Sequence, residues 1–353
     1  MADRDCSESL REQVADALER QAALRIHAAD TRAFYGRALR GEALDVSGHR
    51  GIVDYQPSEL GVTVRAGTPL DELEAELGRH GQMLAFEPPR FGASTIGGAI
   101  ATAMSGPRRP YAGAARDFVL GVRCLNGRAE LLSFGGRVMK NVAGYDVSRL
   151  MTGAFGTLGV LLDISLKVLP LARQELTLER QCEPGEAIRL LNAWAGMPLP
   201  LSASAHDGEV LRVRLSGADS AVRAASASLG ADDCREQPGY WQRLRDQRLP
   251  FFGGNGRLWR LSVPPACAPL PLAGKQYIEW GGALRWLFSD EDAATVRDAV
   301  GALGGHATLY RGARDDEPVF HPLAPAMMQL QRRIKQAFDP AGILDPGRMY
   351  LEI

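Results

Sequence analysis

A stretch of small residues at positions 92–106 constrains this chain more than any other feature. It is GASTIGGAIATAMSG, in which glycine, alanine, serine and threonine predominate. Glycine and alanine leave backbone amides accessible and permit unusual dihedral angles, so a bulky polyanion such as a diphosphate can approach the main chain closely. Tight helix packing or a flexible surface loop would also explain this composition, and composition alone leaves these alternatives open.

Two further observations favour phosphate binding. No G-x-G-x-x-G follows a strand and no G-x-x-x-x-G-K-[ST] occurs, which excludes the Rossmann and P-loop arrangements. A second glycine-rich element at residues 153–159 directly precedes a strongly apolar strand, and a polar turn at residues 140–146 lies between the two elements. The pattern predicts a site in which two glycine-bearing turns hold the phosphates.

Apolar periodicity and turn residues predict a series of short helices and strands. Thr68 is expected to cap the N-terminus of one helix, with Pro69 in its first turn, and Asp146 is expected to cap another. The expected helices cover residues 10–24, 68–79, 146–151 and 329–338, and the expected strands cover residues 24–27, 43–46, 51–55, 61–67, 117–125 and 158–168.

The distribution of tryptophan predicts a second module. All five tryptophans follow Pro170, which indicates a separate core in that part of the chain. Prolines at positions 264, 265, 269 and 271 predict a surface connection within it. We therefore expect three parts, which are residues 1–172, 173–310 and 311–353.

Charge and cysteine content exclude several classes of function. Lys plus Arg number 41 and Asp plus Glu 42, so the net charge is −1 and nucleic acid is not an expected partner. No secretory signal and no transmembrane segment is expected, which predicts a cytoplasmic protein that is free or held at the inner membrane through partners. Five scattered cysteines without a CxxC pair favour a reducing compartment and argue against an iron-sulfur cluster in this chain.

Five motifs in a fixed order resemble a known flavin fold. Residues 94–98 (STIGG), 116–121 (RDFVLG), 140–146 (KNVAGYD), 153–159 (GAFGTLG) and 339–347 (DPAGILDPG) resemble the motifs of the vanillyl-alcohol-oxidase family. Residues 106–110 (GPRRP), 137–146 (RVMKNVAGYD) and 280–287 (WGGALRWL) further resemble the FAD-binding E subunits of bacterial glycolate oxidases. This second resemblance covers nearly the whole chain.

The resemblance implies an α+β fold. Its parts would be a two-subdomain PCMH-type FAD-binding domain at residues 1–172, an α+β cap domain at residues 173–310, and a C-terminal segment at residues 311–353 that packs back on the FAD domain. The implied cofactor is FAD. No histidine or cysteine occupies an evident attachment position, so we expect the FAD to be noncovalent.

The resemblance also implies which residues meet the cofactor. Thr95, Gly97 and Gly98 are expected to present backbone amides to the diphosphate, and the turn at residues 153–159 to line the adenine and ribose. Asp117 is expected either to contact the cofactor or to cap local backbone. The full expected set is Ala29, Asp30, Thr31, Thr95, Ile96, Gly97, Gly98, Ala101, Asp117, Asn141, Tyr145, Gly153, Gly156, Thr157, Gly159 and Val160.

The first loop departs from the family pattern. Relatives carry an Arg-Gly-Gly-Gly-Thr/Ser run where this chain has HAADT at residues 27–31. Fewer glycines leave fewer positions free to adopt positive φ, so looser diphosphate binding is expected there. Asp30 also places a carboxylate near the expected anion, which costs affinity unless its side chain points away.

Catalytic residues are less evident than cofactor residues. Oxidation of a 2-hydroxy acid on a flavin needs a base for the hydroxyl proton and cations for the carboxylate. Related dehydrogenases bind a metal through an H-x-H pair and a Glu-His pair, but the six histidines here are isolated, so no metal is expected. His306, Arg311 and Arg348 are the candidates for a substrate pocket. Structural roles in local backbone contacts or ion pairs are the alternatives.

The resemblance implies the FAD-binding subunit of a multi-subunit glycolate oxidase, which oxidises glycolate to glyoxylate. Its implied partners are a homologous FAD-linked subunit and an iron-sulfur subunit that takes the electrons. Because the metal-binding histidines are missing, we expect this subunit to hold a second flavin or relay while the homologous partner performs most of the hydride abstraction. A flavin-free structural subunit and a stand-alone 2-hydroxy-acid dehydrogenase are the alternatives.

Overall fold

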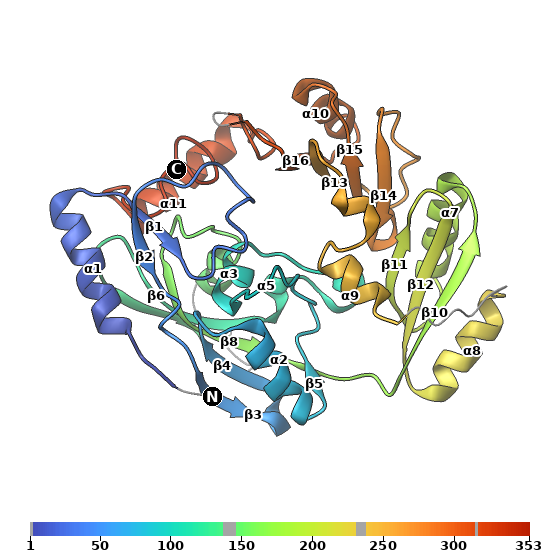
Figure 1. Cartoon of the computed structure of the whole chain (residues 1–353), viewed down its shortest axis with the longest axis horizontal. Helices are drawn as coiled ribbons and strands as arrows, with labels where there is room; N and C mark the ends of the chain where they lie inside the picture. The colour runs from blue at the N-terminus through green and yellow to red at the C-terminus, as the bar shows by residue number, and fades with distance from the viewer. Residues whose placement is uncertain (1–2, 137–145, 231–237, 315–316) are drawn as a thin grey trace.

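The computed structural model describes residues 3–136, 146–230, 238–314 and 317–353. It has two lobes, each with its own β-sheet, and helices pack against both sheets (Figure 1). The first lobe contains both the N-terminal part of the chain and the C-terminal helix, and the second lobe contains the middle part (Figure 1). This arrangement confirms the expected α+β fold class, while the boundaries at residues 172 and 310 stay a prediction.

The first lobe is built on a five-stranded antiparallel sheet in the order β3-β4-β8-β6-β7. Its central strand β8 is the apolar strand expected from the sequence, and seven of its eight residues are buried. The strands are β3 (Ile52–Gln56), β4 (Gly61–Arg65), β6 (Val119–Leu125), β7 (Leu131–Gly135) and β8 (Val160–Lys167).

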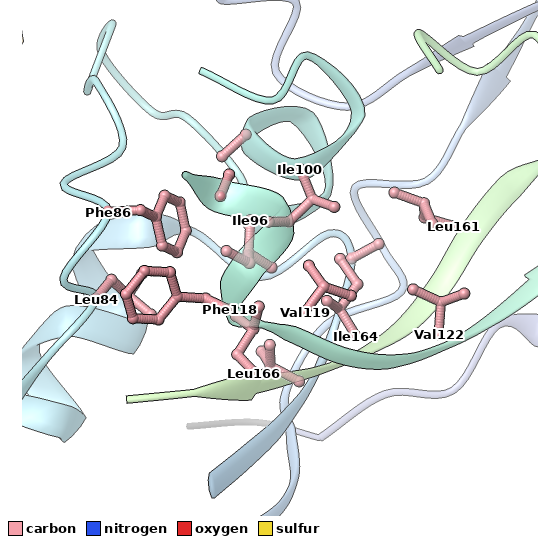
Figure 2. Packing of buried hydrophobic residues seen from close by; sticks show 14 of the residues in the cluster. Leu84, Phe86, Ile96, Ile100, Phe118, Val119, Val122, Leu161, Ile164 and Leu166 are labelled. Carbon is pink, nitrogen blue, oxygen red and sulfur yellow. The ribbon is translucent and has the colours of Figure 1, made fainter. Parts of the chain in front are cut away.

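Short helices cover one face of this sheet. Ile96 and Ile100 of the small-residue helix α3 point onto β6 and β8, and Phe86 and Phe118 pack beside them (Figure 2). These side chains are almost wholly removed from water, which is the main stabilising contribution to such a core. The helices are α2 (Leu70–Arg79), α3 (Ile96–Ala101), α5 (Ala115–Phe118) and α6 (Val147–Met151). The short helix α4 (Arg109–Ala112) lies instead against β11 (Leu201–His206) of the second lobe.

The two ends of the chain meet in the same lobe. The strands β1 (Leu24–His27) and β2 (Glu42–Asp45) form a parallel pair, and the amide of Leu24 donates to the carbonyl of Ile343 at 2.7 Å. Leu10 and Val14 of α1 (Ser7–Arg20) share an apolar cluster with Leu344, which lies beyond α11 (Pro325–Phe338). The C-terminal segment therefore packs back on the first lobe, as the fold class requires.

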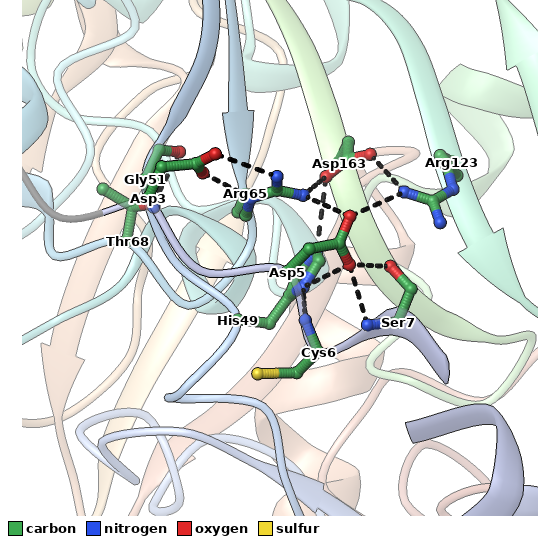
Figure 3. Close-up of polar contacts among 10 residues, drawn as sticks. All are labelled: Asp3, Asp5, Cys6, Ser7, His49, Gly51, Arg65, Thr68, Arg123 and Asp163. Atoms are coloured by element: carbon green, nitrogen blue, oxygen red, sulfur yellow. Dashed lines mark hydrogen bonds and ion pairs between the residues drawn. The ribbon is translucent and has the colours of Figure 1, made fainter. Parts of the chain in front are cut away.

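A polar network fixes the N-terminus to the sheet (Figure 3). Antiparallel register places Asp163 of β8 opposite Arg65 of β4 and Arg123 of β6, with N–O distances of 3.5 and 2.9 Å. The buried His49 accepts a hydrogen bond from the Cys6 amide at Nδ1, so its Nε2 carries the proton that faces Asp163. Burial opposes ionisation of Asp5, but hydrogen bonds from Ser7 hold the pKa of Asp5 well below its usual range. The ionised carboxylates of this network therefore stabilise the contact between the N-terminal segment and the sheet.

The second lobe has a seven-stranded antiparallel sheet in the order β10-β12-β11-β14-β15-β13-β16. Two apolar clusters form where helices pack against this sheet, one with α7 and α8 and the other with α10. The elements are β10 (Gln174–Gln181), α7 (Pro184–Ala195), β11 (Leu201–His206), β12 (Val210–Gly217), α8 (Asp219–Leu229), α9 (Tyr240–Arg245), β13 (Leu258–Ser262), β14 (Lys275–Glu279), β15 (Leu284–Phe288), α10 (Ala293–Gly301) and β16 (His306–Arg311).

An aromatic cluster joins the lobes. Tyr35 and Phe155 of the first lobe pack with Trp286 and Tyr310 of the second. The indole of Trp280 also crosses the seam and donates to the carbonyl of Gly106 at 3.0 Å. The second lobe has apolar clusters of its own, as expected, but the tryptophans do not mark a single one. They divide among three clusters, and one of these is shared by both lobes.

Two local expectations have opposite outcomes. Asp146 caps α6 as expected, because its carboxylate accepts from the amide of Arg149 at 3.2 Å. Thr68 does not cap α2, whose N-cap is Pro69. The hydroxyl of Thr68 instead accepts from the amide of Gly51 at 2.9 Å, so a tertiary contact replaces the expected local one.

Candidate functional site: a cleft beside the small-residue helix

A cleft with a cavity of about 120 Å³ opens beside the N-terminal end of α3. We call it the cofactor cleft. Four segments that are far apart in the sequence form its walls: the loop after β1, the start of α3, the turn before β8, and the C-terminal segment. Its lining includes Ile26, His27, Ala28, Ala29, Asp30, Thr31, Arg32, Ala33, Thr95, Gly97, Gly98, Ala101, Thr102, Phe155, Gly156, Gly159, Asp345 and Arg348.

The two glycines at the start of α3 serve different purposes. A Cβ atom on Gly97 would lie 2.7 Å from both the side chain and the carbonyl oxygen of Ala66, so only glycine allows α3 to approach β4 this closely. The Gly97 amide already donates to that carbonyl at 2.8 Å, which corrects the expectation that it faces a diphosphate. A Cβ on Gly98 would be 3.6 Å from Nη1 of Arg32. The Gly98 amide is engaged as well, because it donates to Oγ1 of Thr95, the N-cap of α3, at 3.3 Å. Gly98 therefore contributes space beside the Arg32 guanidinium.

Arg32 provides the positive charge of the cleft, and our sequence analysis missed it. Its side chain is buried, and Nη2 donates to the carbonyl of Pro89. Its Nε has no hydrogen-bond partner, and no carboxylate of the described residues forms an ion pair with it. Burial lowers the pKa of Arg32 to about 10, which leaves it charged at neutral pH. An uncompensated buried cation beside an open glycine turn fits an anionic group such as a diphosphate.

The carboxylate of Asp30 is neutralised locally. Its Oδ2 lies 3.1 Å from Nη1 of Arg25 and 3.6 Å from Nδ1 of His27. The backbone of Asp30 has a φ of 51°, so this loop reaches the left-handed region without glycine. The expected penalty of a carboxylate beside the anion is therefore offset by its ion pair with Arg25.

The second glycine-rich turn contacts the C-terminal segment. Gly156 has a φ of 79°, and a Cβ there would lie 2.3 Å from Oδ2 of Asp345. That buried carboxyl accepts from the amide of Ile26 at 3.3 Å, and burial raises its pKa to about 7. Asp345 stands in the C-terminal motif quoted above, but its place in the cleft depends on contacts across the chain that the motif does not reveal.

Arg348 lines the cleft but is already engaged with backbone. Its guanidinium donates to the carbonyls of Ala33, Tyr35 and Arg37, with distances of 2.9 Å to Ala33 and 2.6 Å to Tyr35. These bonds tie the loop after β1 to the C-terminus. A positioning role in the cleft therefore explains Arg348 better than the proposed contact with substrate.

Other expected site residues lie outside the lining of the cleft. Asp117 accepts from the amide of Ala114 at 2.9 Å, which is the local capping alternative. His306 and Arg311 lie on β16 in the other lobe, where Arg311 donates to the carbonyl of Phe252. Asn141 and Tyr145 lie outside the described residues, and further expected residues away from the lining are Ile96, Gly153, Thr157 and Val160.

A second cavity of about 190 Å³ adjoins the cleft at the seam between the lobes. We call it the seam cavity. Thr102, just beyond α3, lines both. The second lobe contributes Arg260, Glu279 and Tyr310 to its wall. None of these three residues belongs to a motif that the sequence marks as a site.

No group of three or more His, Cys, Asp and Glu side chains in the described part of the chain is arranged to hold a metal ion. No helix within the described ranges combines the length and apolar character needed to cross a bilayer.

Comparison with known proteins connects the cleft to a cofactor. The family described as "FAD binding domain" matches residues 5–135. The chain is 45% identical to glycolate oxidase subunit GlcE of Escherichia coli (strain K12) over 350 residues, which cover 99% of both chains. It is also 31% identical to glycolate oxidase subunit GlcD of Bacillus subtilis (strain 168), over 36% of this chain and 27% of that one.

A solved structure of alkyldihydroxyacetonephosphate synthase has the same fold. The TM-score is 0.68 at 15% identity, and the match covers 96% of this chain and 74% of that one. Fold and cleft together define an FAD-binding oxidoreductase with the vanillyl-alcohol-oxidase architecture. Within this class, identity across the full length decides the family, and the chain belongs to the family of glycolate oxidase subunit GlcE.

Proposed function

We propose that this chain is the FAD-binding subunit of a multi-subunit glycolate oxidase, which converts glycolate to glyoxylate. Its partners in this proposal are a homologous FAD-linked subunit and an iron-sulfur subunit that receives the electrons. The assembly works in the cytoplasm, attached to the inner membrane through its partners. The three parts at residues 1–172, 173–310 and 311–353 serve as flavin-binding domain, cap and returning segment.

The observation that carries this proposal is identity to GlcE over essentially all of both chains. A shared cofactor domain would give a match confined to part of the chain, as with GlcD, where 36% of this chain is covered. Here the cap and the C-terminal segment match as well. That relative is a subunit of an oxidase, which supports a role within a complex.

The residues of the cofactor cleft fit a noncovalently bound FAD. Arg32 and the turn at Gly98 would hold the diphosphate, and Gly156 with Asp345 would face the nucleoside part. Arg348 keeps the loop after β1 in place. When bound, FAD accepts the hydride of a 2-hydroxy acid and passes the electrons on singly. The chain's own residues orient the cofactor and exclude water.

The test is to purify the complex and the isolated chain and to measure bound FAD and glycolate-dependent reduction of a dye. We expect about one FAD per chain, released into the supernatant by acid precipitation because it is noncovalent. We expect glycolate turnover to need the partner subunits. A colourless chain that takes up no FAD on reconstitution would leave only a structural role in the complex. Full turnover by the isolated chain would instead indicate a stand-alone dehydrogenase.

A further inference from the structure

The seam cavity has one wall from each lobe. Residues 102–107, which follow α3, form the first wall, and the second includes side chains from α9 and from strands β13 to β16. The lobes are held together around it by the Trp280 bond to Gly106 and by an ion pair of 2.8 Å between Arg214 and Glu87. Contacts between the two lobes therefore define this cavity. It adjoins the cofactor cleft at Thr102, next to the proposed flavin.

Arg260 gives this cavity an uncompensated positive charge. It lies on β13 between Trp286 of β15 and Thr308 of β16, and its guanidinium is 5.1 Å from the ring centroid of Trp280. No carboxylate of the described residues lies within ion-pairing distance of it. Arg245 also lines the cavity, but it pairs with Asp246 at 2.7 Å. Arg260 is thus the lining cation that is free to bind an anion.

Glu279 brings an acid to the same cavity. The residue is 5% exposed, and its Oε1 accepts from the indole nitrogen of Trp286 at 2.6 Å. The Trp286 bond is the one hydrogen bond of this carboxyl within the described residues, so its other oxygen is not engaged, and Glu279 lines the cavity. Burial raises the pKa of Glu279 to about 7, although the Trp286 bond and the charge of Arg260 act against this. A carboxyl with one open oxygen suits a hydroxyl group as its partner.

Two further polar side chains of the lining are already engaged. The amide nitrogen of Gln247 donates to the hydroxyl of Tyr310 at 3.0 Å, and that hydroxyl faces the sulfur of Met104 at 3.9 Å. The charged groups open to the cavity are therefore one cation and one carboxyl oxygen, and the hydroxyl of Tyr35 lies in the same lining. This pairing matches a small molecule with an anionic end and a hydroxyl end.

We propose that the seam cavity binds a small 2-hydroxy monocarboxylate, with its carboxylate on Arg260 and its hydroxyl on Glu279. The proposal rests on the proposed function for the choice of an oxidisable hydroxy acid. It departs from the division of labour expected from the sequence, because this subunit then has a substrate site without the metal-binding histidines of its relatives. The recognition uses two residues from strands β13 and β14 of the second lobe's sheet, which β15 separates, in place of a metal.

Binding to the isolated full-length chain tests this directly. Glycolate, acetate and ethylene glycol are titrated by calorimetry, because acetate lacks the hydroxyl and ethylene glycol lacks the carboxylate. We expect glycolate to bind about tenfold more tightly than acetate, as one hydrogen bond to a charged group allows, and ethylene glycol not to bind. Equal affinity for glycolate and acetate, or no glycolate binding, overturns the assignment.

Variants assign the two roles. Arg260→Gln is expected to weaken glycolate and acetate alike by about 10- to 100-fold, because both lose a charged partner. Glu279→Gln is expected to abolish the preference for glycolate while acetate affinity changes less than about threefold. The matched control is Arg297→Gln, which also removes an arginine stacked on a tryptophan but lies outside the cavity. An equal loss of glycolate affinity in the Arg297 and Arg260 variants contradicts the proposal.

Bound FAD and circular dichroism are measured on every variant, so that a folding defect is recognised. A chain that binds no FAD refutes the proposed function, yet its glycolate titration still tests the cavity. A chain that binds FAD but shows no Arg260-dependent glycolate binding refutes this inference and leaves the proposed function intact.

Discussion

The cofactor cleft and the seam cavity contain similar chemical groups built in different ways. Each has a buried or half-buried arginine without a carboxylate partner, Arg32 or Arg260, and each has a buried carboxyl whose pKa is about 7, Asp345 or Glu279. The cleft is shaped largely by backbone at glycine-bearing turns. The cavity is shaped by long side chains on strands that meet only in the folded sheet. Short motifs therefore reveal the first site, while the second needs the fold.

The largest expected effect concerns the arginine that closes the cleft. Arg348→Ala leaves the carbonyls of Ala33, Tyr35 and Arg37 without their donor, which is expected to cost about 3–5 kcal/mol of unfolding free energy together with loss of FAD. Arg311→Ala removes one bond to one carbonyl and is the matched comparison, at about 1 kcal/mol. Urea denaturation measures both. Similar losses of unfolding free energy in the two variants would show that Arg348 contributes no more to stability than Arg311.

The acid of the seam cavity predicts a dependence of stability on pH. Its pKa is about 7 in the folded chain against 4.5 as the ordinary value, so the native state binds more protons than the unfolded state between these pH values. The unfolding free energy contributed by Glu279 therefore falls as pH rises through this window, by at most about 3 kcal/mol.

Glu279→Gln removes this group, so its stability relative to the unaltered chain should rise between pH 5 and pH 8. Asp345 titrates in the same range in both proteins, and its contribution cancels in the difference. Denaturation at several pH values gives the curve. A difference that stays constant from pH 5 to pH 8 means that Glu279 ionises like an exposed carboxyl.

Replacing Arg32, the cation of the cleft, is expected to lower FAD affinity without lowering the stability of the chain. Arg32→Met should weaken FAD binding by about 10- to 100-fold, because a charge-assisted contact with the diphosphate is lost. The flavin-free chain should keep its stability or gain slightly, since a buried charge without a counter-ion has been removed. Arg109→Met, which stacks on Trp280 outside the cleft, is the control. Unchanged FAD affinity would exclude Arg32 from diphosphate binding.

The smallest expected effect decides between the two readings of Asp117. Asp117→Ala should cost about 1 kcal/mol through loss of the bond from the Ala114 amide, with FAD content unchanged. Thermal denaturation and flavin absorbance measure the two quantities. A fall in FAD content at unchanged stability would favour cofactor contact over local capping.

The fold class and many residues that line the cleft could be predicted from the sequence, because the signals for them lie within short segments of the chain. Gly98 and Gly156 belong to motifs whose small residues permit tight turns and close approach of the main chain. Asp146 caps the helix that directly follows it. Arg32 was missed because an arginine beside a loop has no pattern that marks it as unpaired. Only the folded structure shows that the carbonyl of Pro89 accepts a hydrogen bond from Arg32 and that no carboxylate of the described residues forms an ion pair with it.

Residues on strands were harder to predict for a related reason. Glu279 and Arg260 are 19 positions apart and belong to strands separated by β15, so their shared cavity depends on sheet order. Thr68 failed as an N-cap because the distant Gly51 satisfies its hydroxyl. Cross-strand register and tertiary hydrogen bonds are set by the whole chain, and no short window of sequence contains them.

The position of Asp345 and Arg348 has a consequence for biosynthesis. Both line the cofactor cleft, yet more than 310 residues separate them from the loop after β1 and the strand before it, which they contact. Until the segment that carries Arg348 has been synthesised and has docked, this loop lacks the three bonds from its guanidinium. A nascent polypeptide stalled before position 345 should therefore be unable to retain the dinucleotide even though its glycine turns have already emerged.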